Sequence, residues 1–174
     1  ATFRIPKVEV AIVYHAPPLP FKTSSYQQEA GKRFGISPKQ AMGIAQKLYE
    51  AGKITYHRTD TMRLADVFKE AVKTYVTDTY GDEFLSEEMK TGSGKEEEKK
   101  KGEQAAHEAI RPTSVTETNL VGEFSALEQT IYRMIWIQAV ASLMAKEKCQ
   151  RHTAMVIFSN TEAYWFVASY TFTL

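Results

Sequence analysis

The sequence predicts an α+β fold in which a helical, winged-helix-like domain is inserted between β segments contributed by both chain ends. Apolar residues alternate with polar ones near both termini, as they do in strands, whereas the middle of the chain repeats them at helical spacing. A proline-rich stretch, His15–Pro20, separates the first strand from the helices. We therefore expect residues 1–16 and 150–174 to form the β part and residues 17–149 the helical domain.

Composition limits the class of protein. The 174 residues are 43% hydrophobic and 25% charged, values typical of a globular domain. No run approaches the roughly 20 apolar residues of a membrane span, so we expect no membrane partner. The single cysteine, Cys149, excludes an internal disulfide and a thiolate metal cluster and suits a reducing compartment. Because the chain starts at Ala1 and ends inside a strand-like run, we expect it to be a piece of a larger protein.

The charge is unevenly distributed although the net charge is only +1. Residues 22–63 carry eight lysines and arginines against three acidic residues, and an acidic excess follows in residues 78–98. A basic segment of this kind suits a polyanionic substrate. Ordinary variation of a protein surface explains the same numbers equally well.

The first element expected is a strand over residues 3–14. Its alternation places Val8, Val10, Ile12 and Tyr14 on one face, the pattern of a sheet with one buried side.

Two helices and a short strand are expected next. Ser24 with Gln27, or Ser25 with Gln28, can form a capping box, and Gly35 can end the first helix. A second capping box at residues 37–40, with proline at the first helical position, opens a helix that ends at Gly52. The spacing of Tyr49 on this helix predicts a core residue. Residues 53–56 read as a short strand. Helix, turn, helix and strand in this order are typical of a winged helix-turn-helix.

The later elements show the same periodicities. Residues 64–76 repeat apolar side chains at helical spacing, and residues 91–103 read as a flexible charged loop. Ser125 and Glu128 can cap a long helix that we expect to run to about Lys148. Residues 154–158 and 164–172 have the pattern of strands.

Two dense polar clusters carry the candidate chemistry. The first, Tyr56–Thr61, holds a tyrosine, and an arginine two residues later would share its strand face. A guanidinium there could bind a phosphate and favour the nucleophilic phenolate. The second cluster is His107–Arg111. If the two meet in space, Tyr56 can attack phosphorus while the arginines at 58 and 111 neutralise the oxygens and a histidine, 57 or 107, assists.

Five stretches have the character of motifs: Pro18–Ser24, Gln27–Gln28, Ala45–Gly52, Ile54–Asp60 and His107–Pro112. In this order and approximate spacing they resemble the type IA DNA topoisomerases. The resemblance covers roughly residues 17–113, and the combination is far more specific than any one stretch. The histidine directly after Tyr56 resembles reverse gyrases in particular.

The resemblance implies roles for these residues. Tyr56 is implied to be the nucleophile that cleaves one DNA strand and holds its 5′ end as a phosphotyrosine, and Arg58 to position the scissile phosphate. His107 is implied to contact the backbone near the break. The flanking strands are implied to belong to an arch domain that lets the tyrosine domain swing, after which strand passage and religation change the DNA topology. Further candidate DNA contacts are Arg111, His57, Thr59, Asp60, Gln28, Lys53 and Arg63.

The resemblance also implies partners outside the chain. Type IA enzymes use an acidic toprim domain that binds Mg²⁺, and its Asp-x-Asp-x-Glu type of cluster does not occur in these 174 residues. We therefore expect no cofactor and no metal ligand in this chain, Mg²⁺ in the full enzyme, and no relaxation of DNA by the chain alone. The expected partners are DNA, mainly single-stranded at the cleavage site, and the remaining topoisomerase domains. The expected location is the cytoplasm, in association with the nucleoid.

Two other functions remain open on the residues. A non-catalytic winged-helix DNA-binding module would use Lys39, Lys47 and Arg63 to contact phosphate while Tyr56 merely packs. Tyrosine recombinases and nicking enzymes also form phosphotyrosine, but recombinases use dispersed arginines and histidines ahead of a late tyrosine, and here the tyrosine comes early.

Overall fold

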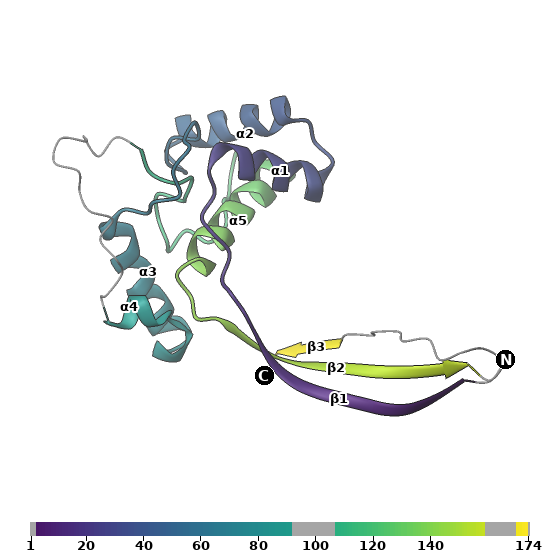
Figure 1. The fold of residues 1–174 in the computed structure, drawn as a ribbon. Helices are drawn as coiled ribbons and strands as arrows, with labels where there is room; N and C mark the ends of the chain where they lie inside the picture. The colour runs from purple at the N-terminus through teal and green to yellow at the C-terminus, as the bar shows by residue number, and fades with distance from the viewer. Residues whose placement is uncertain (1–2, 92–106, 159–169, 174) are drawn as a thin grey trace. The chain divides into compact units, whose positions relative to one another are not determined.

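The structure, a computed structural model, describes residues 3–91, 107–158 and 170–173. The chain divides into two compact units (Figure 1). The strand unit consists of Ala1–Ala16 and Lys146–Leu174, and the helical unit is Pro17–Ala145. The second boundary lies four residues before the expected one, because the chain enters a strand at Glu147.

The strand unit is an antiparallel sheet with the order β1-β2-β3. Strand β1 (Phe3–His15) pairs with β2 (Glu147–Phe158), and β2 pairs with β3 (Tyr170–Thr173). The β1–β2 register shifts between Arg4 and Lys7, where Pro6 has no N–H to donate to the ladder. The α+β class, with strands from both chain ends, is therefore confirmed. The predicted strand over residues 164–169 lies outside the described residues.

The apolar face of β1 is not buried, contrary to the prediction. Its alternating side chains are about half exposed, from 46% at Ile12 to 63% at Tyr14. An alternating strand buries one face only where a second layer packs on it. The described residues of the strand unit supply no such layer.

The helical unit begins with two helices joined by a short turn, α1 (Thr23–Phe34) and α2 (Pro38–Glu50). Gly35 ends α1 with φ of 65°, and Ser37 and Gln40 form the predicted capping box of α2. The cap of α1 differs from both predictions. The helix starts at Thr23, and the Ser25 hydroxyl bonds the backbone of Lys22 at 3.1 Å.

The remaining helices are α3 (Asp66–Thr79), the 3₁₀ turn η1 (Asp82–Phe84), α4 (Glu87–Thr91) and α5 (Ala126–Ala141). None of the described helices is long and apolar enough to cross a membrane. Ser125 and Glu128 form the predicted capping box of α5. The helix ends seven residues before Lys148, because Met144 forms an isolated bridge with Leu85. The predicted charged loop at 91–103 lies, beyond Thr91, outside the described residues.

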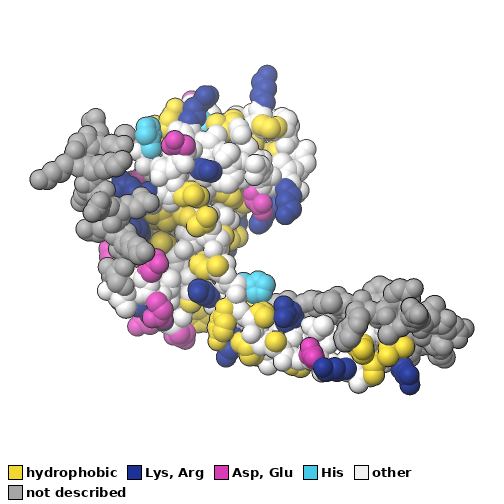
Figure 2. All heavy atoms as spheres, viewed as in Figure 1, with side chains coloured by type: hydrophobic (Ala, Val, Ile, Leu, Met, Phe, Trp, Pro, Cys, Tyr) yellow, Lys and Arg dark blue, Asp and Glu magenta, His cyan; other side chains and the backbone are white. Residues whose placement is uncertain are grey.

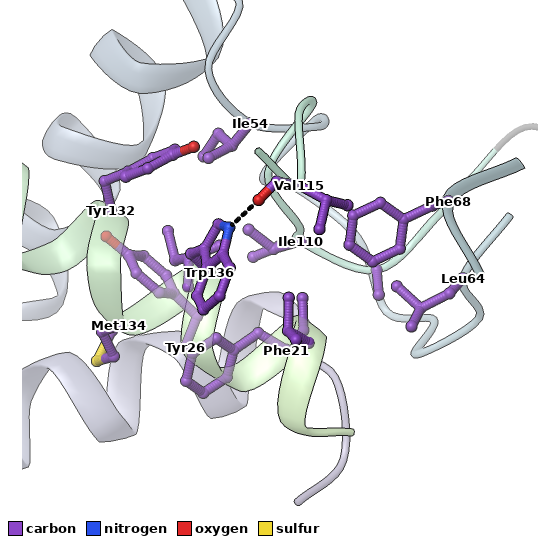
Figure 3. Packing of buried hydrophobic residues seen from close by; sticks show 14 of the residues in the cluster. Phe21, Tyr26, Ile54, Leu64, Phe68, Ile110, Val115, Tyr132, Met134 and Trp136 are labelled. Carbon is purple, nitrogen blue, oxygen red and sulfur yellow. Dashed lines mark hydrogen bonds between the residues drawn. The ribbon is translucent and has the colours of Figure 1, made fainter. Parts of the chain in front are cut away.

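The core of the helical unit is built around α5 (Figure 3). Tyr132 and Trp136 are buried, and their polar atoms donate to backbone oxygens of Glu117 (2.6 Å) and Val115 (2.8 Å). Tyr26 of α1 is buried and donates to the Ala41 carbonyl at 2.8 Å. Each of these buried hydroxyl or N–H groups therefore has an acceptor, as burial in a low dielectric requires.

The winged-helix form is not confirmed. Residues 53–56 do not form the expected strand, since only Ile54 makes an isolated bridge, to Pro112. The described residues between α2 and α3 contain no strand that could form a wing. An irregular loop that carries Tyr56 comes after α2 instead.

Candidate active site

The segment before Tyr56 is fixed by the second polar cluster. The backbone N–H of Thr55 donates to the Arg111 carbonyl at 2.9 Å, and the Arg111 N–H donates to the Thr55 hydroxyl at 3.0 Å. The same hydroxyl donates to the Ala109 carbonyl at 2.7 Å. Two segments more than fifty residues apart in sequence are thus joined beside the tyrosine.

The segment after Tyr56 is fixed by Thr23, the first residue of α1. The Thr23 hydroxyl lies 2.8 Å from the His57 carbonyl and 3.0 Å from that of Thr59, and it accepts from the Thr59 N–H at 2.9 Å. The Thr23 N–H donates to the Thr59 carbonyl at 2.9 Å. We call these contacts the Thr23 clamp. They hold residues 57–59 against a helix end.

An open pocket of about 380 Å³ lies at this junction. It is lined by Thr23, Arg58, Thr59, Asp60 and His107. The structure therefore brings the two polar clusters together, as the hypothesis of a shared phosphate site required. The basic and imidazole side chains, together with the N-terminal end of α1, make the pocket suitable for an anion.

Tyr56 lies next to this pocket in sequence but its ring contacts other rings. The side chain is 43% exposed. Its ring meets that of Tyr49 edge-on at 5.2 Å between centroids and that of His57 at 5.3 Å. The Tyr56 hydroxyl makes no hydrogen bond with another described residue, so it is free to meet a substrate.

His57 is fully buried, and neither ring nitrogen has a hydrogen-bond partner within the described part of the chain. Burial holds the pKa of the His57 imidazole below its usual value of 6.5, and the positive charge of Arg58 lowers it further. The Glu50 carboxylate opposes this shift. The ring is therefore neutral at pH 7.

The Arg111 side chain contacts other protein groups, whereas the sequence suggested that it contacts a phosphate. Its Nε donates to Glu108 at 2.6 Å and its Nη1 to the Pro112 carbonyl at 3.0 Å. The guanidinium also lies over the Phe68 ring, 4.6 Å from the centroid. These contacts tie the second cluster to α3, and Arg111 does not line the pocket. A phosphate contact by Arg111 stays a prediction.

The outer candidates are scattered. The Lys53 ammonium pairs with Glu117 at 2.7 Å, while Arg63 and Gln28 lie exposed on the surface. On the face shown in Figure 2, basic side chains gather over α1 and α2 and acidic ones over α3 and α4. This distribution agrees with the charge pattern of the sequence.

A metal site is not evident in the part of the chain that the structure describes. No group of three or more histidine, cysteine, aspartate or glutamate side chains there could hold a metal ion.

Two residues of this site were missed by the sequence reasoning. Thr23 was part of a motif but received no role, although a hydroxyl at the start of a helix is a frequent partner of nearby backbone. Tyr49 was predicted to be a core residue from its spacing. It is 40% exposed and contacts the rings of Tyr56 and His57 instead.

Comparisons with known proteins identify the family of the chain. The sequence model of a family described as DNA topoisomerase matches residues 1–171. DNA topoisomerase 1 of Streptomyces coelicolor is 40% identical over 147 residues, which cover 82% of this chain and 15% of that protein. DNA topoisomerase 1 of Synechocystis is 39% identical over 148 residues, which cover 84% and 16%. The reverse-gyrase resemblance stays a prediction.

A solved structure supports the same relationship. Full-length topoisomerase I from Thermotoga maritima matches with a TM-score of 0.73 and 29% identity, over 99% of this chain and 28% of that one. The chain spans about one sixth of the length of the curated relatives that it matches. On the family match, the identities and the shared fold, this chain belongs to the type IA DNA topoisomerases.

Proposed function

We propose that this chain supplies the nucleophile and part of the phosphate site of a DNA strand-cleaving enzyme. The Tyr56 phenol oxygen attacks a backbone phosphorus, the bond to the 3′ oxygen breaks, and the 5′ phosphate becomes a phosphotyrosine. The released strand end takes up the proton and leaves as a 3′-hydroxyl. The same hydroxyl later attacks the phosphotyrosine, which reseals the strand and restores the phenol.

One observation carries the proposal. An exposed tyrosine with an unbonded hydroxyl stands two residues from Arg58, and Arg58 shares an open pocket with His107. The guanidinium can neutralise the charge that grows on the non-bridging oxygens during in-line attack. The histidine can donate a hydrogen bond to the same phosphate. Thr59 and Asp60 complete the lining of the pocket.

The whole-protein activity extends beyond the chain. We propose that the remainder of the enzyme supplies the toprim domain and its Mg²⁺, that the substrate is mainly single-stranded at the break, and that strand passage changes DNA topology. We further propose that the flanking sheet belongs to the arch. The enzyme would act in the cytoplasm on nucleoid DNA, with Gln28, Lys53, Arg63 and Arg111 as secondary contact candidates. The predicted DNA contact by His57 is wrong, because its side chain is fully buried and cannot reach a backbone phosphate.

The test uses the full-length enzyme that contains this chain. With Mg²⁺ and an oligonucleotide labelled at its 3′ end, we expect label to become covalently attached to the wild-type protein. A 5′-end label should not be transferred, because the 5′ phosphate is the side that is retained. Tyr56→Phe should abolish transfer, since it removes only the hydroxyl. Tyr80→Phe, a change at another exposed tyrosine, serves as the matched control.

Covalent label on the Tyr56→Phe enzyme would refute the proposal. DNA binding by the wild type with no covalent adduct at all would instead favour the non-catalytic binding module. The comparisons give that module no support, because the matched relatives are named as topoisomerases.

A further inference from the structure

The ring of Tyr56 is held by neighbouring rings, whereas its hydroxyl is not held by a hydrogen bond to any described residue. The hydroxyl has no partner among the described residues, while the ring meets Tyr49 and His57 edge-on at 5.2 Å and 5.3 Å. The Tyr49 and His57 rings also meet each other, at 5.9 Å. Three aromatic rings therefore form a closed triangle. Edge-to-face contacts of this kind fix the direction of a ring more than simple burial does.

Tyr49 projects from a rigid element. It lies in the last turn of α2, where the chain reverses through Gly52 at φ of 70°. The Gly52 N–H donates to the Tyr49 carbonyl at 2.8 Å, and the Lys53 N–H donates to the Leu48 carbonyl at 2.9 Å. The position of this ring is thus set by a capped helix end rather than by a loop.

The core does not need the Tyr49 ring. The buried face of α2 is made by Ala41, Ala45 and Leu48. Tyr49 stands beside that face and remains 40% exposed. An exposed aromatic that packs mainly on the nucleophile and on His57 serves the site, not the fold.

His57 forms the floor of the triangle. Its imidazole is completely buried, and neither nitrogen has a partner among the described residues. Such an arrangement lowers the stability of the fold, so its presence calls for another explanation. The imidazole meets the Tyr56 ring at 5.3 Å between centroids, and because it is neutral it places no charge beside that ring. The charged groups that act on it are Arg58 and Glu50.

From this arrangement, and resting on the proposed function, we propose that Tyr49 is a positioning residue that acts through the ring of Tyr56. Together with His57 it aims the phenol oxygen at a phosphate held by Arg58. A nucleophile that is moved out of line with the phosphorus attacks more slowly, while the contacts that bind the substrate stay in place. The effect therefore belongs to the cleavage step and not to DNA affinity.

The experiment measures the cleavage rate of full-length enzyme variants at saturating oligonucleotide, together with the dissociation constant for the same DNA. Tyr49→Ala should cleave roughly tenfold more slowly, the loss expected for one ring contact and a looser nucleophile. Its affinity for DNA should stay within about twofold of wild type. Tyr49→Phe keeps the ring and should restore the rate to within about twofold. Tyr49→Leu, which fills the space without a ring, should resemble Tyr49→Ala and replaces it if that variant fails to fold.

The matched control is Tyr80→Ala. Tyr80 is 49% exposed and meets two rings edge-on, those of Tyr75 at 6.3 Å and Phe84 at 6.2 Å, but it does not touch Tyr56. Its loss should leave the cleavage rate unchanged. An equal loss in Tyr80→Ala, or cleavage by Tyr49→Ala at the wild-type rate, overturns the proposal. So does a weakened affinity with a normal rate at saturation, which would make Tyr49 a DNA contact.

A second measurement separates this proposal from the proposed function. Fluorotyrosine placed at position 56 of the full-length enzyme reports the surroundings of the ring by ¹⁹F resonance, with no need for catalysis. Tyr49→Ala should move the resonance towards that of free fluorotyrosine, whereas Tyr80→Ala should not. An unmoved resonance overturns the positioning role. Covalent adducts formed by the Tyr56→Phe enzyme would refute the assignment of Tyr56 as the nucleophile. They would leave the ¹⁹F result unchanged, because that resonance reports only the surroundings of the ring.

Discussion

At the scale of single residues, the site is defined by side chains with unusual surroundings. Among the described residues, His57 is buried without a hydrogen-bond partner for its ring, and Tyr56 beside it is exposed without one for its hydroxyl. Motif and chemistry pointed to Tyr56, Arg58 and His107, because a nucleophile, a cation and a hydrogen-bonding imidazole suit phosphoryl transfer. Burial of His57 could not be read from the sequence, since histidine is found both inside and outside folded domains.

The burial of His57 predicts a pH-dependent stability. The folded-state pKa of this imidazole lies below 6.5, so the unfolded chain takes up the proton more readily. Stability is therefore fully present above pH 6.5 and declines as pH falls below it. Urea titrations of the chain at pH 7.5 and 5.5, followed by helical circular dichroism, should show a larger loss for wild type than for His57→Leu.

The control for this prediction is His107→Leu, a change at the exposed pocket histidine. It should retain the wild-type difference between the two pH values. Equal pH dependence in wild type and His57→Leu would contradict the burial of a neutral His57.

Tyr49 shows a limit of helical periodicity. Successive residues on a helix are rotated by about 100°, so the residue after Leu48 stands at the edge of the buried face. Spacing alone cannot say whether such an edge residue packs inward or outward. Here the decision is made by Tyr56 and His57, which reach that edge from outside the helix.

At the scale of elements, the starts of α2 and α5 were predictable, whereas the contacts between segments far apart in the sequence were not. The capping boxes that begin with Ser37 and Ser125 are local, and both were confirmed. The end of α5 depends on a bridge between Met144 and Leu85, far apart in sequence. The segment after α2 became a loop because Thr55 pairs with the backbone at residues 109–111 rather than with a wing. Non-local pairings of this kind leave no periodic signal.

The Thr23 clamp predicts that two substitutions at Thr23 lower stability by different amounts. Thr23→Val keeps the shape but removes the hydroxyl that serves His57 and Thr59. We expect it to lower the free energy of unfolding by about 1–3 kcal/mol, because partly buried backbone groups lose a partner. Thr23→Ser keeps the hydroxyl and should recover most of this. Urea unfolding followed by helical circular dichroism measures both.

Thr74→Val provides the comparison for the clamp. The Thr74 hydroxyl bonds the Glu70 carbonyl within α3 at 3.1 Å on an exposed surface. Its loss should change the unfolding free energy by no more than about 0.5 kcal/mol. If both valine variants behave alike, the clamp has no special role in holding the loop.

At the scale of the whole molecule, the mixed α+β class with strands from both chain ends was predictable from alternation at the termini. Val8 and its neighbours on β1 show what was not predictable. Alternation identifies a strand and its faces, but what covers a face is decided by other elements. The division into two units places a hydrophobic core in Pro17–Ala145 that contains α1, α2, α3 and α5.

This division predicts that Pro17–Ala145 folds without the strand unit. Its core is contained within that range, and the chain passes between units at only two places. We expect cooperative melting within about 5 °C of the full 174-residue chain, measured by helical circular dichroism. A version that stops at residue 125 lacks α5, with Tyr132 and Trp136, and should not melt cooperatively. Failure of Pro17–Ala145 to melt cooperatively would show that the helical unit depends on the strands.

The first residues of the helical unit give it a mechanical property. The Leu19 carbonyl is held by the Gln138 amide at 2.8 Å, the Phe21 carbonyl by the Ile110 N–H at 2.8 Å, and Thr23 closes on residues 57 and 59. These three attachments come one after another from the point where the chain enters at Pro17. A force applied at Pro17 would therefore meet these three attachments in turn, and it would reach the loop that bears Tyr56 only after the first two had given way.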